Sequence, residues 1–226
     1  MCAIAGIIGE KTENISSMMN AQIHRGPDDL NTFIGDGISI GMARLEIIDL
    51  VSRGLCLYRY EDFILTYNGE VYNYIQLRTE LESLGVKFET NSDTEVVLKS
   101  YIEWGFDCFS KFNGIFALGI FDSKKNKIIL ARDITGEKPL YYYTSGKAFA
   151  FASEAKSFVD NFPLSNNQDT AFFNAFQHCL HTTLYKEVNA LPPASYMVID
   201  KNSMKYEINK YWNFKQRDIN LNTADE

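Results

Sequence analysis

Residues that bind metals or form disulfides are scarce in this sequence. The 226 residues include three histidines and four cysteines, and the cysteines, at positions 2, 56, 108 and 179, form no CxxC pair. In a helix, the spacing of His178 and His181 would place two ring nitrogens on one face, but the sequence shows no obvious third ligand nearby. The composition therefore argues against a metal centre or a disulfide framework and favours a reduced, cytoplasmic compartment.

Long apolar runs and an excess of positive charge are also missing. No stretch of about 18 apolar residues occurs, so we expect no membrane-spanning helix, and no charged leader precedes an apolar segment as in a signal peptide. The formal net charge of −7 disfavours a nucleic-acid partner, since phosphate binding needs a basic face. A hydrophobic content of 46% is ample for the packed core of one large domain or two small ones.

The hydrophobic periodicity predicts an α+β fold, with antiparallel strands toward both ends and helices between them. Strands are expected near residues 3–8, 31–34, 38–44, 63–67, 114–121, 127–132, 139–143, 148–151, 195–199 and 205–208. Helices are expected near residues 14–23, 74–84, 92–105 and 169–176.

Cys2 has an unusual position, because removal of Met1 would make it the first residue of the chain. It would then carry a thiol nucleophile and a free α-amine that is partly unprotonated near neutral pH and can take the thiol proton. The alternative is that Cys2 is simply a small apolar residue entering a buried strand. Taken alone, the position favours that alternative.

Three further groups have both a structural and a functional interpretation. Asn68-Gly69 is a common tight-turn dipeptide, and the spacing alone favours a turn. The Asn68 side-chain amide and the Gly69 backbone N–H could instead form an oxyanion hole. Ser92-Asp93-Thr94-Glu95 is a helix capping box, while Asp93 at the first turn could hold an ammonium group. Arg44, at the end of an apolar strand, either pairs with a structural carboxylate or binds a ligand carboxylate.

Together, a thiol, an oxyanion hole, an arginine and an aspartate are the groups needed to bind a free amino acid and hydrolyse its side-chain amide. With these groups in place, the sequence resembles the glutaminase domain of the asparagine synthetase-type glutamine amidotransferases. The matching segments, in the family's order, are MCAIAGIIG (1–9), HRGPDD (24–29), GMARLEIIDL (41–50), LTYNGEVYNY (65–74), SDTEVVL (92–98), FNGIFALGIFD (112–122), ARDITGEKPLYYY (131–143) and FASEAKS (151–157). LPP (191–193) and Tyr211-Trp212 are similar to the family's closing elements.

The resemblance implies the four-layer αββα sandwich of the N-terminal nucleophile hydrolases, with two stacked antiparallel sheets. It implies that Cys2 attacks the glutamine side-chain amide and that Asn68 and Gly69 stabilise the oxyanion. It further implies that Arg44 binds the α-carboxylate of the substrate and that Asp93, with Glu70, binds the α-ammonium. Ile47 would complete the substrate-binding set.

The resemblance also implies a division of labour between domains. Residues 1–210 would form the amidotransferase domain, and residues 211–226 a tail or linker toward a synthetase domain or subunit. The chain lacks the family's Ser-Gly-Gly-rich loop for ATP pyrophosphate, so ATP and magnesium are expected only in that missing synthetase part, and no cofactor here. The implied partners are L-glutamine and the synthetase, with a homodimer as a further possibility.

Some positions depart from the family pattern. Ala3 stands where the family usually has glycine, residues 53–60 lack its Gly-x-Gln-Pro element, and Ile134, Thr135 and Glu137 replace its usual residues. The ammonia acceptor therefore stays open: asparagine synthesis or amidation of a sugar or antibiotic precursor. Two other functions also remain open, an N-terminal cysteine acylase of other linear amides and a non-catalytic glutamine-sensing module.

Overall fold

The computed structural model describes residues 2–45, 57–166 and 183–214 of the chain. Several sequence-based expectations lie outside these residues: Ile47, the helix near 169–176, the pair His178 and His181, and most of the tail at 211–226.

Two six-stranded sheets form the centre of the fold, and every strand pair within them is antiparallel. In spatial order the first sheet contains β10 (Val188–Ala190), β8 (Tyr141–Thr144), β9 (Ala148–Ala152), β1 (Ala3–Gly9), β3 (Ile38–Arg44) and β2 (Asp29–Gly35). The second sheet contains β12 (Tyr206–Lys210), β11 (Ser195–Asp200), β7 (Lys127–Arg132), β6 (Gly114–Asp122), β5 (Phe63–Val71) and β4 (Tyr58–Tyr60).

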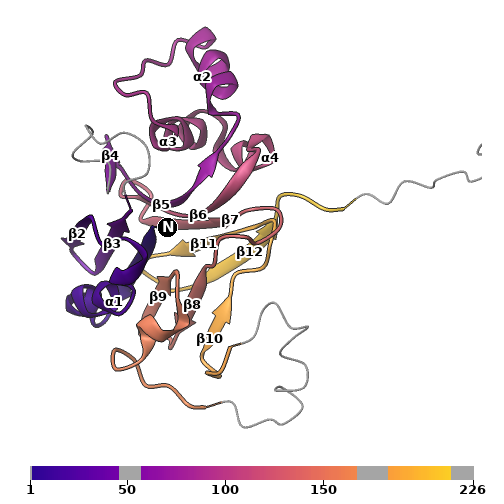
Figure 1. Cartoon of the computed structure of the whole chain (residues 1–226). Helices are drawn as coiled ribbons and strands as arrows, with labels where there is room; N and C mark the ends of the chain where they lie inside the picture. The colour runs from indigo at the N-terminus through magenta and orange to yellow at the C-terminus, as the bar shows by residue number, and fades with distance from the viewer. Residues whose placement is uncertain (1, 46–56, 167–182, 215–226) are drawn as a thin grey trace, which may run out of the picture.

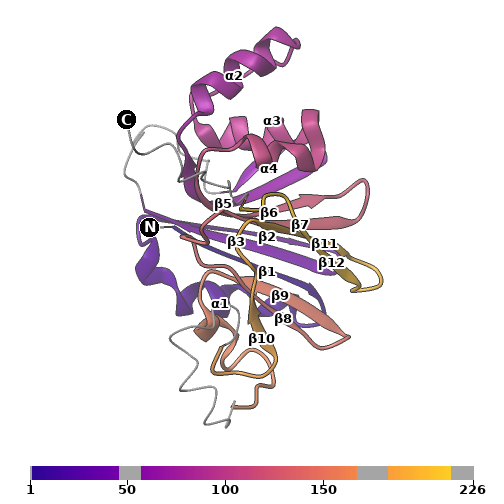
Figure 2. The ribbon, with the colours of Figure 1, turned by 90° about the vertical axis from the view of Figure 1, so that its right-hand side faces the viewer.

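Helices cover the outer face of each sheet (Figure 1, Figure 2). The first sheet carries α1 (Ile15–Ala21) and a 3-10 helix at Ala155–Phe158, while the second carries α2 (Tyr74–Ser83), α3 (Asp93–Trp104) and α4 (Cys108–Lys111). Further 3-10 helices span Thr12–Asn14, Ile23–Arg25 and Gly105–Asp107. The order helix, sheet, sheet, helix confirms the predicted αββα sandwich.

Alternation of side chains along the central strands separates the layers. Ile4 and Ile8 of β1 enter the core between the sheets, whereas Ala3, Ala5 and Ile7 pack toward α1. Because successive side chains of a strand point to opposite faces, both faces of β1 are apolar and buried. This burial on two sides explains why β1 is a continuous apolar run rather than an alternating one.

The two sheets approach closely around the ring of Phe151. This side chain is 1% exposed, and its ring lies over Gly6 in β1 and Gly119 in β6. A Cβ atom at Gly6 would lie 2.3 Å from the ring, and one at Gly119 would lie 2.9 Å from it. One aromatic ring therefore occupies the space that two glycines leave open, one from each sheet.

The prediction of a turn at Asn68-Gly69 is wrong, because β5 continues through both residues to Val71. In the ladder Asn68 pairs with Ala117 and Gly69 with Phe116. The partner strand β6 begins at Gly114 and supplies hydrogen-bonding groups along this whole length, so the local turn preference is overridden by pairing with β6. The short strands β4 and β10 and the single-turn helix α4 were not foreseen.

No helix among the described residues combines the length and the apolar character that crossing a membrane would require.

The packing around Phe151 leads to a stability prediction. Phe151→Ala should lower the free energy of unfolding by about 3–5 kcal/mol, because it removes a fully buried ring and leaves a cavity between the sheets. Urea denaturation followed by circular dichroism measures this loss. The control is Ile34→Ala in β2, where the side chain is 60% exposed and a loss below about 1 kcal/mol is expected. Equal losses in the two variants would contradict the assignment.

Candidate active site

Cys2 and Arg44 lie at the same end of neighbouring strands. Ala3 pairs with Ala43 in the antiparallel ladder, so the next positions outward are Cys2 and Arg44. Both alanines face the α1 layer, so alternation directs Cys2 and Arg44 toward the space between the sheets. Cys2 is partly buried there and packs against the core between the sheets.

Two buried side chains fix the strand that begins after Cys2. The backbone N–H of Ile4 donates to Ser153 Oγ at 3.0 Å, and Gln22 Nε2 donates to the Ile4 carbonyl at 3.0 Å. Gln22 and Ser153 are fully buried. Breaking hydrogen bonds inside a core is costly, because it leaves buried polar groups unpaired. These contacts therefore hold the backbone at Ile4 in place.

An arginine and a glutamate hold the backbone of Cys2 itself. Arg25 Nε donates to the Cys2 carbonyl at 3.2 Å, and Arg25 Nη1 donates to Glu154 Oε1 at 3.1 Å. The same Glu154 carboxylate also contacts His24 at 3.0 Å and Lys156 at 3.1 Å. Burial acts to raise the pKa of Glu154, but hydrogen bonds from Lys156, Arg25 and His24 outweigh it and hold that pKa below its usual value.

Asn68 extends from β5 into the space between the sheets. Thr66, on the same face of β5, donates its hydroxyl to the Gly41 carbonyl of β3 at 3.1 Å, and alternation places Asn68 on that face too. The Asn68 side chain is 1% exposed, and its Nδ2 atom has no hydrogen-bond partner among the described residues. A buried donor without a partner is costly, which is typical of groups that serve a ligand or a reaction.

Gly69 permits a close approach between β5 and β6. A Cβ atom at this position would lie 2.3 Å from the Ile115 carbonyl oxygen and 2.6 Å from Phe116 Cα. Because both contacts are to backbone, a side chain could fit only if the two strands moved apart. Glu70 follows on the inner-face register with Asn68, and it is exposed at the end of the layer.

Asp93 begins α3 and is held from β5 on two sides. The Tyr67 hydroxyl donates to Asp93 Oδ2 at 2.8 Å, and the Val71 backbone N–H donates to the same oxygen at 3.2 Å. Burial raises the pKa of Asp93, and these hydrogen bonds, with one from Thr94, partly oppose that rise. The carboxylate is thus partly desolvated, and one of its oxygens accepts from both donors of β5.

The capping box predicted at Ser92–Glu95 is only half formed. Ser92 Oγ accepts from the Thr94 N–H at 3.1 Å and so caps α3. The Glu95 carboxylate does not return to Ser92, since it accepts from the Glu89 N–H at 2.9 Å and the Thr90 N–H at 2.7 Å, and pairs with Lys99 at 2.6 Å. Glu95 therefore fixes the segment that leads into α3.

The predicted site residues that the structure describes belong to both sheets and one helix. The residues Cys2, Arg44, Asn68 and Glu70 share the inner register of their strands. Asp93 instead begins α3 and contacts Tyr67, whose ring lies on the outer face of β5. Burial first, then Asp93, Glu70 and Cys2 in turn, raise the pKa of Tyr67, which places these groups within electrostatic range of one hydroxyl. Ile47 lies outside the described residues.

Sequence reasoning missed the residues that support this site. They are Gln22, Arg25, Tyr67, Ser153 and Glu154. Each of them except Gln22 lies inside a matched segment: HRGPDD, LTYNGEVYNY or FASEAKS. The signal was therefore present, but the motifs alone did not indicate which of their residues contact one another.

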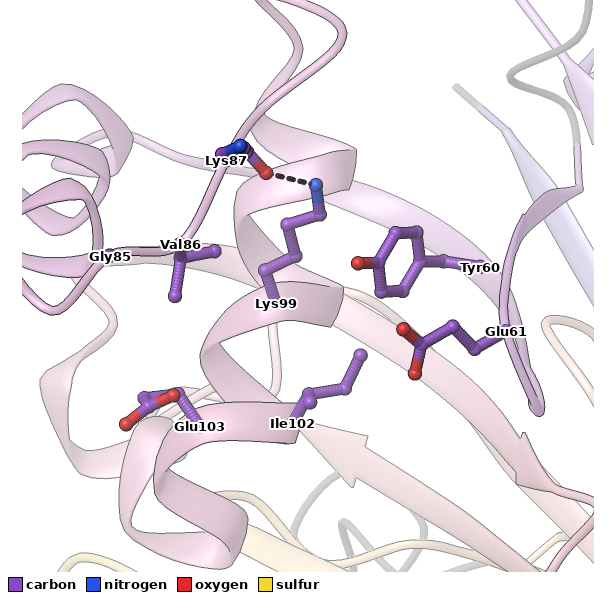
Figure 3. A pocket seen from close by; sticks show the side chains of 8 residues that line it. All are labelled: Tyr60, Glu61, Gly85, Val86, Lys87, Lys99, Ile102 and Glu103. Carbon is purple, nitrogen blue, oxygen red and sulfur yellow. Dashed lines mark hydrogen bonds between the residues drawn. The ribbon is translucent and has the colours of Figure 1, made fainter.

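Among the described residues there is a pocket but no group suited to a metal ion. No group of three His, Cys, Asp or Glu residues in the described part of the chain is arranged to hold a metal ion. A pocket of about 320 Å³ lies between β4, α3 and the segment after α2 (Figure 3). Its lining includes Tyr60, Lys99 and Glu103, and none of the predicted site residues.

Comparisons with known proteins define the class and then the family. The fold matches glutamine phosphoribosylpyrophosphate amidotransferase from B. subtilis, solved with ADP and GMP, with a TM-score of 0.69 at 21% identity over 93% of this chain and 49% of that one. The glutamine amidotransferase domain model matches residues 1–212, so the chain belongs to that family.

Two curated relatives are glutamine-hydrolysing asparagine synthetases. Asparagine synthetase 3 of Bacillus subtilis is 34% identical over 94% of this chain and 37% of the relative. A putative asparagine synthetase 2 of Methanocaldococcus jannaschii is 42% identical over 70% of this chain and 35% of the relative. The chain thus spans about a third of the length of these relatives.

The Glu154 cluster predicts a pH-dependent contribution to stability. Because the pKa of Glu154 is lowered in the folded state, its contribution is present above the ordinary pKa of a glutamate and is lost as the pH falls through the folded value. Glu154→Gln should therefore lower the free energy of unfolding by about 1–2 kcal/mol at pH 7, with a smaller difference at acidic pH. Urea titrations at both pH values measure the effect.

The matched control for that change is Glu82→Gln in α2. Glu82 also bonds an arginine, Arg78, but its side chain is 49% exposed. We expect a loss below about 0.5 kcal/mol there, because solvent screens such pairs. A Glu154 variant as mild as this control would show that the cluster does not hold the N-terminal segment.

Proposed function

We propose that this chain hydrolyses L-glutamine to L-glutamate and ammonia. The observation that carries the proposal is the buried side-chain amide of Asn68, whose Nδ2 lacks a partner among the described residues and faces the layer that Cys2 enters. A preformed donor with no internal partner suits the oxyanion of an acyl transfer reaction. Membership of the amidotransferase family supplies the matching chemistry.

The proposed reaction has two steps, both at Cys2. After removal of Met1, the α-amine takes the thiol proton, and Sγ attacks the side-chain carbonyl carbon of glutamine. The resulting oxyanion receives hydrogen bonds from Asn68 Nδ2 and the Gly69 N–H, and collapse of the intermediate forms a γ-glutamyl thioester while ammonia leaves with the transferred proton. Water then attacks the thioester, which releases glutamate and restores the thiol.

Substrate recognition is assigned to the charged residues around this centre. Arg44 binds the α-carboxylate, since a guanidinium matches a carboxylate with two parallel hydrogen bonds. Asp93 binds the α-ammonium with help from Glu70, and Ile47 completes the pocket. The α-carboxylate and the α-ammonium of the free amino acid thus each meet a side chain of opposite charge.

The ammonia is proposed to serve an ATP-dependent synthetase. The relatives named above are glutamine-hydrolysing asparagine synthetases, and this chain corresponds to about a third of their length. ATP and magnesium would act in that further domain or subunit, in a cytoplasmic setting. Amidation of aspartate is the acceptor reaction that the relatives' names support, and a homodimer of the chain is compatible with the proposal.

The nucleophile gives the first test of the proposal. The parent chain should lack Met1 by intact-mass measurement and release ammonia from glutamine, while Cys2→Ala should lose that activity by at least about a thousandfold because no thioester can form. Ammonia is measured by a coupled assay with and without an asparagine synthetase-type partner. A chain that lacks Met1 but shows no Cys2-dependent ammonia release, even with the partner, would refute the proposal.

The same assay separates the other two functions. Faster cleavage of amides with apolar acyl groups than of glutamine would indicate a cysteine acylase. Retention of Met1 together with glutamine binding would indicate a sensing module.

Asn68 gives the second test. Asn68→Ala should lower kcat for glutamine hydrolysis by about 100- to 1,000-fold with little change in KM, because its amide acts on the transition state. It should lower stability by less than about 1 kcal/mol, because its Nδ2 makes no internal hydrogen bond among the described residues.

Asn73→Ala is the matched control for Asn68. The Asn73 amide donates to the Lys111 carbonyl at 3.0 Å and accepts from the Asn113 N–H at 2.9 Å. We expect this variant to lose stability but keep kcat. If both variants lost stability and kcat in parallel, Asn68 would be a structural amide like Asn73.

A further inference from the structure

Tyr67 places a buried hydroxyl next to the candidate ammonium site. Its side chain is 3% exposed, and the ring packs in the core between the second sheet and its helices. The hydroxyl donates to Asp93 Oδ2 at 2.8 Å. We propose, resting on the function proposed above, that Tyr67 is a positioning residue that sets recognition of the glutamine α-ammonium by orienting the Asp93 carboxylate.

The contacts of Asp93 explain how orientation would arise. The Tyr67 hydroxyl and the Val71 N–H both bond to Oδ2, so two donors from β5 fix the plane of the carboxylate, and neither of them uses Oδ1. A carboxylate whose orientation is fixed before binding loses less entropy when a ligand binds.

Ser92 and Asp93 both accept hydrogen bonds at the start of α3, and Asp93 does so from the Thr94 N–H. Ser92 provides the N-terminal cap of α3 through its contact with the Thr94 N–H. The cap at Ser92 therefore does not depend on the contact between Tyr67 and Asp93.

Tyr67 acts only as a donor toward Asp93. Burial raises the pKa of the Tyr67 hydroxyl first, and the carboxylate of Asp93, which accepts its hydrogen bond, and then that of Glu70 raise it further. The hydroxyl therefore stays protonated throughout the working range of pH, and the hydrogen bond to the ionised Asp93 is of the charge-assisted kind.

The test compares binding of two probes that differ only in the α-amino group. L-Glutamine and glutaramate, which is glutamine without that group, are titrated by calorimetry into the full chain carrying Cys2→Ala, with and without Tyr67→Phe. The phenylalanine retains the ring packing and removes one hydroxyl. We expect glutamine binding to weaken roughly tenfold and glutaramate binding to stay within about twofold, because only glutamine uses Asp93.

Tyr58→Phe is the matched control for this experiment. Tyr58 is also a buried tyrosine of the second sheet, and its hydroxyl interacts with a carboxylate of α3, namely Glu95. Removing this hydroxyl should cost stability but leave the preference for glutamine over glutaramate unchanged. An equal loss of preference in the two variants would overturn the proposal.

The pH dependence of glutamine binding gives a second measurement. Burial raises the pKa of Asp93 and the Tyr67 hydrogen bond opposes that rise, so Tyr67→Phe should raise this pKa further. Since the ammonium binds the ionised carboxylate, the acidic loss of glutamine binding should begin at a higher pH in the variant. Glu70 is unchanged in both chains, and Cys2 is replaced in both, so neither accounts for a difference.

The outcomes separate this inference from the proposed function. If the parent chain neither binds glutamine nor releases ammonia from it, the proposed function fails and the inference fails with it. If the parent is active but Tyr67→Phe binds glutamine as tightly as the parent, with an unshifted acidic limb, only the role of Tyr67 is refuted.

Discussion

The contact between the two sheets is the constraint on which the rest of this structure depends. Phe151 fills the space left by Gly6 and Gly119, and the Thr66 hydroxyl bonds across to the Gly41 carbonyl of the opposite sheet. Because the sheets are fixed face to face, the alternate residues of β1, β3 and β5 meet in one layer. The chemistry assigned to Cys2 and Asn68 requires that meeting, since one begins the first sheet and the other belongs to the second.

Different kinds of interaction hold the two halves of the site. The segment around Cys2 is held mainly through its backbone, by neutral donors in the core and by Arg25 with its partner Glu154. Asp93 is held through its side chain, by two donors of β5. A nucleophile needs a free side chain on a fixed backbone, whereas a binding carboxylate needs a fixed side chain, so each arrangement suits the role proposed for its residue.

The sequence predicts the long strands well because their periodicity reflects burial on both faces, and it places β7 and the helix beginning at Asp93 correctly. It fails at Asn68-Gly69, where a local turn preference competes with nine paired residues along β5 and β6. The short strands β4 and β10 carry too few residues for a period to be seen. Tyr67 could not be identified as a partner of Asp93, because its position indicates only an apolar face, and the contact depends on how α3 lies on the sheet.

The buried amide of Asn68 connects stability with function. Buried polar groups of this core commonly have partners, as Thr66 shows, and a donor without one lowers stability. Asn68 Nδ2 is one of six buried side-chain atoms of the described residues that have no hydrogen-bond partner, Gln22 Oε1 among them. The Asn68 amide lowers stability in the free chain, but it would gain a hydrogen bond when negative charge develops on the oxygen of a bound carbonyl. An interaction that forms only in the transition state is the kind that raises kcat. Among the described residues, Asn68 differs from the other unpartnered groups in lying on the inner face of β5, in the layer that Cys2 enters, and this position is what connects its amide with catalysis.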